Sequence, residues 1–92
     1  MIYKLMFDGK PNKNNQYPVW FIPDHDAIGF RSIPIGHYKQ ASIRFQEWVY
    51  SLPLTGGYDR YNWDDQTNNI IYVNDRRDLA LLKLCFDPVM FG

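Results

Sequence analysis

The chain has almost no cysteine and no excess of charge. Its 92 residues include one cysteine, Cys85, so no disulfide can form within the chain. Ten basic and ten acidic residues give a formal net charge of zero. Without disulfide bonds, stability must come from a packed core, and an aromatic content of 17% supplies large side chains for that core. We therefore expect residues 1–92 to form a single domain.

The balanced charge disfavours nucleic acid as a partner. Domains dedicated to DNA or RNA usually carry a basic excess, because neutralising phosphates supplies much of their affinity. A protein that imitates nucleic acid would need a strong acidic excess instead. The chain has neither.

Long hydrophobic runs are also missing. No apolar stretch approaches the roughly 20 residues of a membrane-spanning helix, and the opening MIYKLMFDGK lacks the apolar region and cleavage site of a signal peptide. Cys85 lies in the apolar run LALLKLCF, which predicts a buried and reduced thiol. These features predict a cytoplasmic protein without a membrane partner.

The patterns of nucleophilic and phosphate-binding sites are absent from the sequence. A catalytic cysteine needs a positioned histidine and a partly exposed thiol, whereas the neighbours Leu82, Leu84 and Phe86 predict burial of Cys85. LTGG at 54–57 lacks the lysine of a phosphate-binding loop. We therefore expect no enzymatic activity and no catalytic residue.

Metal binding has only weak support. Two histidines and two carboxylates could ligate a transition metal: Asp24, His25, Asp26 and His37. Their spacing matches no metal-binding motif, and adjacent side chains of an extended segment point apart. A polar loop, with His37 near a helix start, is the favoured interpretation, so we expect neither metal nor cofactor.

Segments typical of strands and helices alternate along the chain. Strands are expected at 1–7, at 17–23 and, as a β-hairpin, at 58–64 and 70–73, with a short further strand within 28–33. The spacing of Tyr38, Ala41, Phe45, Trp48 and Leu52 predicts a helix from about 37 to 51. A second helix is expected at about 75–86, with a strand at LLKLCF as the alternative. The order predicts an α+β fold: an antiparallel sheet of four to five strands with two helices packed mainly on one face.

The stretch GGYDRYNWDD at 56–65 can be read in two ways. In a strand, Tyr58, Arg60 and Asn62 share one face, and Tyr61 and Trp63 lie on the other. The first face could contact a partner, because tyrosine and arginine dominate interface hot spots. Alternatively, Tyr61 and Trp63 belong to the core and Tyr58 lies at the strand edge. The core interpretation is favoured for the rings, which leaves the polar face beside them as the candidate for contact.

Two further segments could extend such a surface. Arg76 and Arg77 begin the last predicted helix, although Asp75 and Asp78 flank them and neutralise their charge locally. The predicted partner-binding residues are therefore Tyr58, Arg60, Asn62, Arg76 and Arg77. In the tail, residues 89–91 either return to the core or anchor another subunit, so homo-oligomerisation stays open.

The C-terminal part of the chain resembles proteins encoded by short open reading frames of tailed bacteriophages. The resemblance lies in an aromatic strand followed by an Asn-rich turn, a β-branched strand and the segment NDRRDLALLKLCF. The resemblance covers about residues 58–92 and includes no functional motif, so it transfers no site residue. It implies an accessory protein in the host cytoplasm that inhibits a host or viral protein by occluding its surface. The sequence thus favours a non-enzymatic protein-interaction domain. The alternatives are a single-stranded nucleic-acid binder that uses sheet aromatics for stacking, or a minor virion protein.

Overall fold

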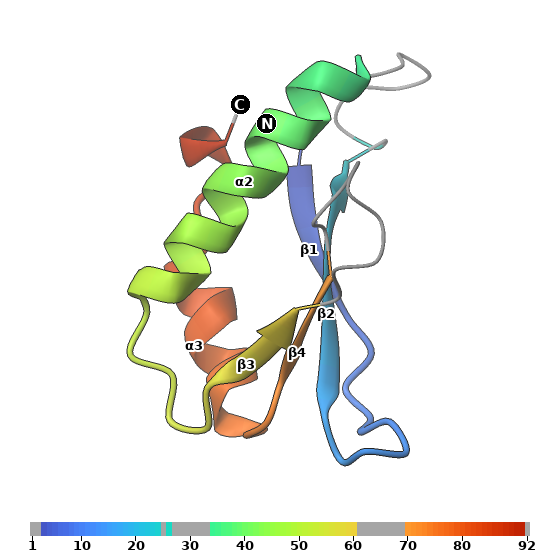
Figure 1. The fold of residues 1–92 in the computed structure, drawn as a ribbon, viewed down its shortest axis with the longest axis vertical. Helices are drawn as coiled ribbons and strands as arrows, with labels where there is room; N and C mark the ends of the chain where they lie inside the picture. Colours follow the sequence, from blue (N-terminus) through green and yellow to red (C-terminus); the bar gives the residue numbers. More distant parts are fainter. Residues whose placement is uncertain (1–2, 25, 27–33, 61–69, 92) are drawn as a thin grey trace.

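The chain forms an antiparallel sheet with two α-helices on one face (Figure 1). The computed structural model describes residues 3–24, 26, 34–60 and 70–91. Its elements are β1 (Tyr3–Phe7), β2 (Tyr17–Pro23), α2 (Ile35–Ser51), β3 (Tyr58–Arg60), β4 (Ile70–Val73), α3 (Arg77–Cys85) and the 3-10 helix η1 (Pro88–Met90). The predicted α+β fold is confirmed, with four strands within the described residues. The strand expected within 28–33 lies outside them.

The four strands are ordered β1-β2-β4-β3, and every neighbouring pair is antiparallel. Residues directly opposite each other project to the same face, so the register aligns Phe7, Val19 and Ile71 in one row. Tyr58 lies opposite Val73, which is buried in the core. In this order β1 and β3 are the two edge strands.

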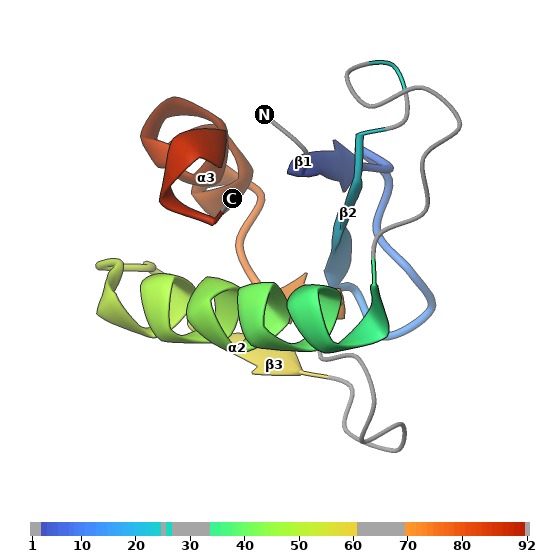
Figure 2. The same ribbon diagram turned by 90° about the horizontal axis from the view of Figure 1, so that it is seen from above.

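The core lies between the sheet and the two helices, which pack on the same side of the sheet (Figure 2). The ring of Phe21 lies at its centre, completely buried, with ring centroids 4.9 Å from Tyr3 and 4.8 Å from Phe45. Helix α2 contributes Ala41 and Phe45 from the predicted stripe, and the half-buried Tyr38, Trp48 and Leu52 pack against the same core. Large rings thus form much of the core of this small domain.

Helix α3 replaces the alternative of a strand at LLKLCF, but its orientation corrects the prediction for Cys85. The buried side chains of α3 are Asp78, Leu79 and Leu82, so one side of the helix faces the core. Cys85 is exposed, and the side chain of Leu84 is 85% exposed. The apolar run LALLKLCF contains more residues than one face of a helix can bury against the core. Hydrophobicity alone therefore did not indicate which of its side chains point toward solvent.

The C-terminal segment returns to the core through one side chain. Phe91 is buried, with ring centroids 5.3 Å from Phe21 and 5.6 Å from Phe86. Val89 and Met90, on η1, remain exposed. Of the two alternatives for the tail, the return to the core holds for Phe91, and contact of Val89 and Met90 with another subunit stays a prediction.

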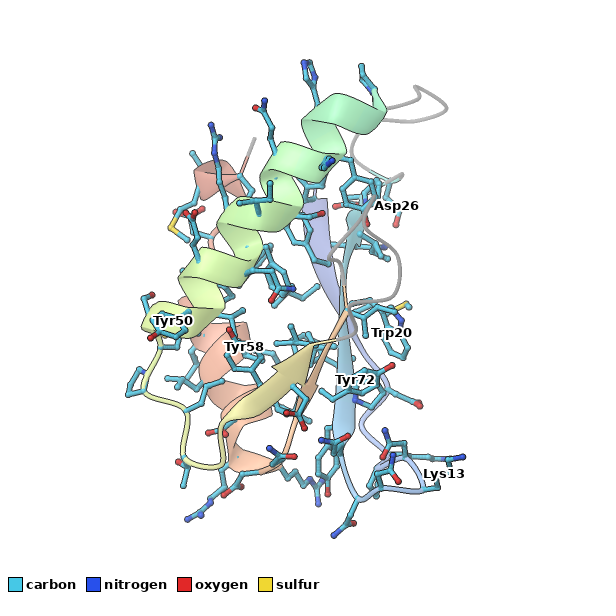
Figure 3. The ribbon with its side chains drawn as sticks, viewed as in Figure 1. Lys13, Trp20, Asp26, Tyr50, Tyr58 and Tyr72 are labelled. Carbon is cyan, nitrogen blue, oxygen red and sulfur yellow. The ribbon has the colours of Figure 1, made fainter. Side chains whose placement is uncertain are left out.

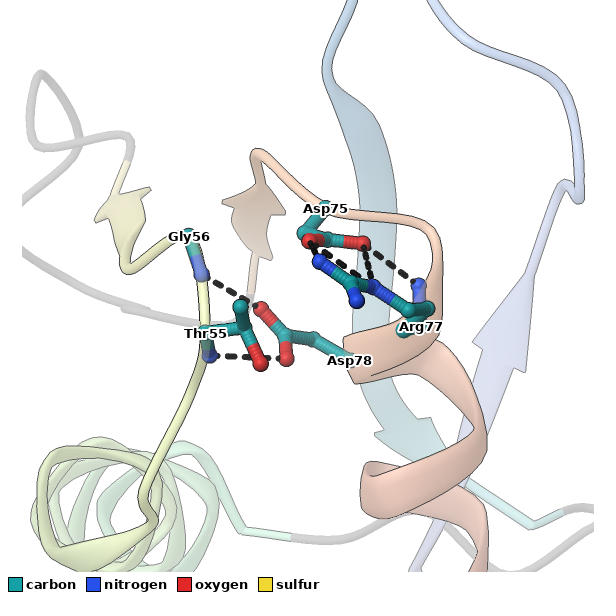
Figure 4. Close-up of polar contacts among 5 residues, drawn as sticks. All are labelled: Thr55, Gly56, Asp75, Arg77 and Asp78. Carbon is teal, nitrogen blue, oxygen red and sulfur yellow. Dashed lines mark hydrogen bonds and ion pairs between the residues drawn. The ribbon is translucent and has the colours of Figure 1, made fainter.

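A buried carboxylate fixes the connection between α2 and β3 to the start of α3 (Figure 4). The two oxygens of Asp78 accept hydrogen bonds from the backbone N–H groups of Thr55, at 2.9 Å, and Gly56, at 3.1 Å. The carbonyl of Gly56 in turn accepts from the side-chain amide of Asn74, at 3.0 Å. Gly56 is thus held at both its N–H and its C=O, and it lies close against Asn74 and Asp75, which follow β4.

This close approach predicts opposite effects for alanine at two glycines. A Cβ on Gly56 would lie 3.0 Å from Cβ and 3.1 Å from N of Asp75, so Gly56→Ala should cost about 1–3 kcal/mol of unfolding free energy. A Cβ on Gly36 meets nothing within 4 Å. Because Gly36 lies in the first turn of α2, Gly36→Ala should instead add about 0.5 kcal/mol. Urea denaturation measures both, and equal effects of the two substitutions would refute this packing argument.

Candidate interaction surfaces

The predicted contact residues of β3 are only partly within the described residues. Tyr58 is half-buried and packs against the core, on the helix-covered face of the sheet. Arg60 ends β3 opposite Ile71, but its side chain lies outside the described part, as do all of Asn62, Tyr61 and Trp63. Partner contact by Tyr58, Arg60 and Asn62 therefore stays a prediction. Tyr58 itself offers less surface than its position in the sequence suggested.

Arg76 and Arg77 both lie exposed at the start of α3 and differ in their partners. The guanidinium of Arg77 donates to the carboxylate of Asp75 at 2.7 Å, whereas Arg76 makes no ion pair within the described residues. The hydrogen bonds from Arg77 hold the pKa of the Asp75 carboxyl below its ordinary value of 3.8. A lowered pKa means that the pair contributes at neutral pH and is lost in acid, as pH falls through that lowered value. Arg76 is thus the more available cation for a partner.

The residues considered for metal binding do not converge in the described part of the chain. One oxygen of Asp24 accepts from the backbone N–H of Asp26 at 3.2 Å, which closes a local turn. His37 is exposed in the first turn of α2, near the helix start as predicted, and His25 lies outside the described residues. Among residues 3–24, 26, 34–60 and 70–91, no three potential ligands gather at one point.

A groove of about 280 Å³ runs beside the edge strand β1. Strand β1 lines one side with Tyr3, Lys4, Leu5 and Phe7. The other side consists of Lys83, Phe86 and Pro88, and Asp24 completes the lining. We call this feature the β1 groove. Its two sides come from opposite ends of the sequence, so no local pattern could have predicted it.

The β1 groove combines an apolar lining with a small positive charge. The ammonium of Lys83 lies 4.9 Å from the ring centroid of Phe7, a distance at which a cation is attracted to the ring face. Neither Lys4 nor Lys83 has a carboxylate within ion-pairing distance in the described structure. Burial raises the pKa of the Tyr3 phenol, so that group stays neutral. Two lysines against Asp24 leave the groove one positive charge in excess.

The face of the sheet turned away from the helices carries a second group of apolar side chains. Trp20 and Tyr72 lie on this face, because they alternate with the core residues Val19 and Val73 (Figure 3). The register pairs Trp20 with Ile70 and Pro18 with Tyr72, so the two rings are diagonal neighbours on adjacent strands. No described helix covers this face. The alternation of side chains expected for a strand at YPVWFIP could have predicted that Trp20 lies on the face opposite Val19 and Phe21.

A third group of exposed apolar residues lies at the C-terminal end of α3 and on η1. Leu84, Val89 and Met90 are all exposed within the stretch 84–90, which also supplies Phe86 and Pro88 to the β1 groove. Apolar side chains near a groove commonly mark contact surfaces when they gather at one place. Leu84 and Val89 directly follow Lys83 and Pro88, which line the groove.

The chain matches no family model, and no curated protein or solved structure is significantly similar to it. None of the helices within the described residues is both long and apolar enough to cross a bilayer.

Proposed function

We propose that this chain is a small non-enzymatic protein-interaction domain that acts by covering part of its partner's surface. The observation that carries the proposal is the β1 groove, where apolar side chains meet two lysines that form no ion pair within the described residues, at the edge of the sheet. Protein interfaces combine an apolar centre with a polar rim in this way. In keeping with the resemblance to phage accessory proteins, the partner would be a host or viral protein in the host cytoplasm.

The zero net charge fits such a role. Without a large excess of charge, long-range attraction between partners is weak, so affinity must come from shape and a few anchoring side chains. Exposed apolar residues such as Leu84 and Val89, which directly follow groove-lining residues in the chain, can serve as anchors. The predicted contact residues Arg60 and Arg76 would contribute at the periphery.

Affinity capture tests this function. The tagged protein is incubated with a bacterial host lysate, with and without nuclease and over a range of salt concentrations, and bound proteins are identified by mass spectrometry. We expect one stoichiometric protein partner that survives both treatments. Arg60→Glu and Arg76→Glu should weaken capture while the circular dichroism spectrum stays unchanged. Recovery of the tagged protein alone would refute the proposal.

Single-stranded nucleic acid is the second candidate partner, because Trp20 and Tyr72 place two rings on the sheet face turned away from the helices. Bases stack on such rings with little sequence preference. Lys10 and Lys13, exposed in the connection between β1 and β2, could contact phosphates. Tyr58, on the helix-covered face, is not suited to this role.

If nucleic acid is the partner, removing either ring should weaken binding by about 1–3 kcal/mol per base stacked. Fluorescence anisotropy with a labelled oligothymidylate would compare Trp20→Ala and Tyr72→Ala with Tyr50→Ala, which removes an exposed ring from α2. Trp20→Phe keeps a ring and should retain most of the affinity. Equal binding by all variants, or binding insensitive to salt, would contradict the stacking role.

A further inference from the structure

We infer that the β1 groove binds an extended peptide segment of the partner, which pairs with the free edge of β1 and places an acidic side chain at Lys83. This inference rests on the proposed function and names the chemistry of the partner. It differs from the contact surface predicted around Arg60, because the groove lies at the opposite edge of the sheet.

The lining shows that the groove follows the edge of β1 and not one face of the sheet. Neighbouring residues of a strand project to opposite faces, yet Lys4 and Leu5 both line the groove. Within the described residues, β1 pairs with β2 on one side only. Its other side therefore carries main-chain N–H and C=O groups able to form hydrogen bonds with an added strand.

The size of the groove suits side chains of a peptide. Its volume of about 280 Å³ lies at the lower end of the roughly 300–1,000 Å³ typical of ligand pockets and leaves room for a few side chains. Strand β1 has five residues, and alternate residues of an added strand point to the same side. Leu5, Phe86 and Pro88 would contact one or two apolar side chains of such a strand.

The charges give the bound peptide a polarity. Lys83 lies at the Phe7 end of β1, over the ring of Phe7. Asp24 lies at the other end, because it follows Pro23, which pairs with Tyr3. At the Tyr3 end the charge of Lys4 is offset by that of Asp24, so a carboxylate on the peptide would be attracted chiefly at the Phe7 end. The favoured ligand is therefore an apolar extended segment with acidic residues at one end only.

A second copy of the chain is a less suitable occupant of the same edge. Its own β1 segment, YKLMF, contains a lysine and no acidic residue. Pairing of two β1 edges would thus bring further positive charge to a groove that already has an excess of it. A partner segment with the opposite charge fits the groove better.

Peptide pools test the inference directly. Terminally blocked peptides about eight residues long would alternate valine, isoleucine or leucine with threonine, a pattern that favours extended strands. One pool ends in two acidic residues and the matched pool in two basic residues. Titrations of the ¹⁵N-labelled full chain should shift the amide signals of residues 3–7 and 83–86, with the acidic pool binding about tenfold more tightly.

Variants of both molecules sharpen the test. Lys83→Glu should reverse the preference between the pools, whereas Lys39→Glu, an exposed change on α2, should leave it unaltered. Acidic peptides with N-methylated backbone amides should bind about tenfold more weakly, because they cannot complete the strand pairing. The inference is overturned if no pool binds at millimolar concentration, if the shifts map to Trp20 and Tyr72, or if signals of β1 change on dilution alone, which indicates a second copy.

The same variant separates this inference from the proposed function. A protein partner captured equally by the wild type and by Lys83→Glu would leave the interaction function standing and refute the role of the β1 groove. Loss of that partner in Lys83→Glu but not in Lys39→Glu would support both. Absence of any protein partner would refute the proposed function, while the peptide titrations would still decide what the groove binds.

Discussion

Replacing Phe21 with alanine should lower the free energy of unfolding by about 3–5 kcal/mol, because it leaves a cavity at the centre of the core. The Phe21 ring is completely buried and stacks on Tyr3 and Phe45. It also meets the ring of Phe91 edge to face, with centroids 5.3 Å apart. Since small domains are stabilised by only about 5–15 kcal/mol, Phe21→Ala should be largely unfolded in moderate urea.

Two further variants make the core prediction specific. Phe21→Leu keeps an apolar side chain and should show a smaller loss than Phe21→Ala. Tyr50→Ala removes a ring that is 83% exposed on α2, and it should change the unfolding free energy by less than about 0.5 kcal/mol. Urea denaturation followed by tryptophan fluorescence measures all three. Similar losses for Phe21→Ala and Tyr50→Ala would show that the core is not centred on Phe21.

Replacing Asp78 with alanine should cost about 3 kcal/mol, because two backbone N–H groups would lose a charged acceptor. The Asp78 side chain is 2% exposed, so water has little access to the vacated position. Its partners, the N–H groups of Thr55 and Gly56, belong to the connection between α2 and β3. Asp78→Asn should fall between Asp78→Ala and the wild type, because an amide can accept from only one of the two groups.

A matched control distinguishes the buried carboxylate from an exposed one. Asp87 also accepts a backbone hydrogen bond, from the N–H of Val89, but it lies at the surface. Asp87→Ala should therefore cost no more than about 1 kcal/mol. Hydrogen exchange gives an independent measurement: the amides of Thr55 and Gly56 should exchange faster in Asp78→Ala. Unchanged protection of these amides would contradict the assigned role of Asp78.

The fold could be predicted from the sequence where the pattern of apolar residues is local. The stripe from Tyr38 to Leu52 specified α2, because a helix brings residues three and four apart to one side. Turn-forming residues at 8–16 separated β1 from β2. These patterns depend only on residues close together in the chain, so they can be recognised without knowledge of tertiary contacts.

Features that depend on tertiary contacts could not be predicted in the same way. Asp78 was expected in the first turn of a helix, but its backbone partners at Thr55 and Gly56 became apparent only in the fold. The exposure of Cys85 depends on which side of α3 faces the sheet. The β1 groove requires β1 and α3 to lie side by side, and neither segment alone indicates it.

The strand order also bears on how fast the domain acquires its structure. The β1–β2 hairpin joins close neighbours, whereas the central pairing joins β2 to β4 across α2. Beside it, the side chain of Gln16 bonds that of Asn74, 58 positions away. Closing so large a loop loses much chain entropy before any contact compensates for it, and such topologies fold more slowly than hairpins or helices. We therefore expect the hairpin and α2 to form early and the pairing of β2 with β4 to limit the folding rate.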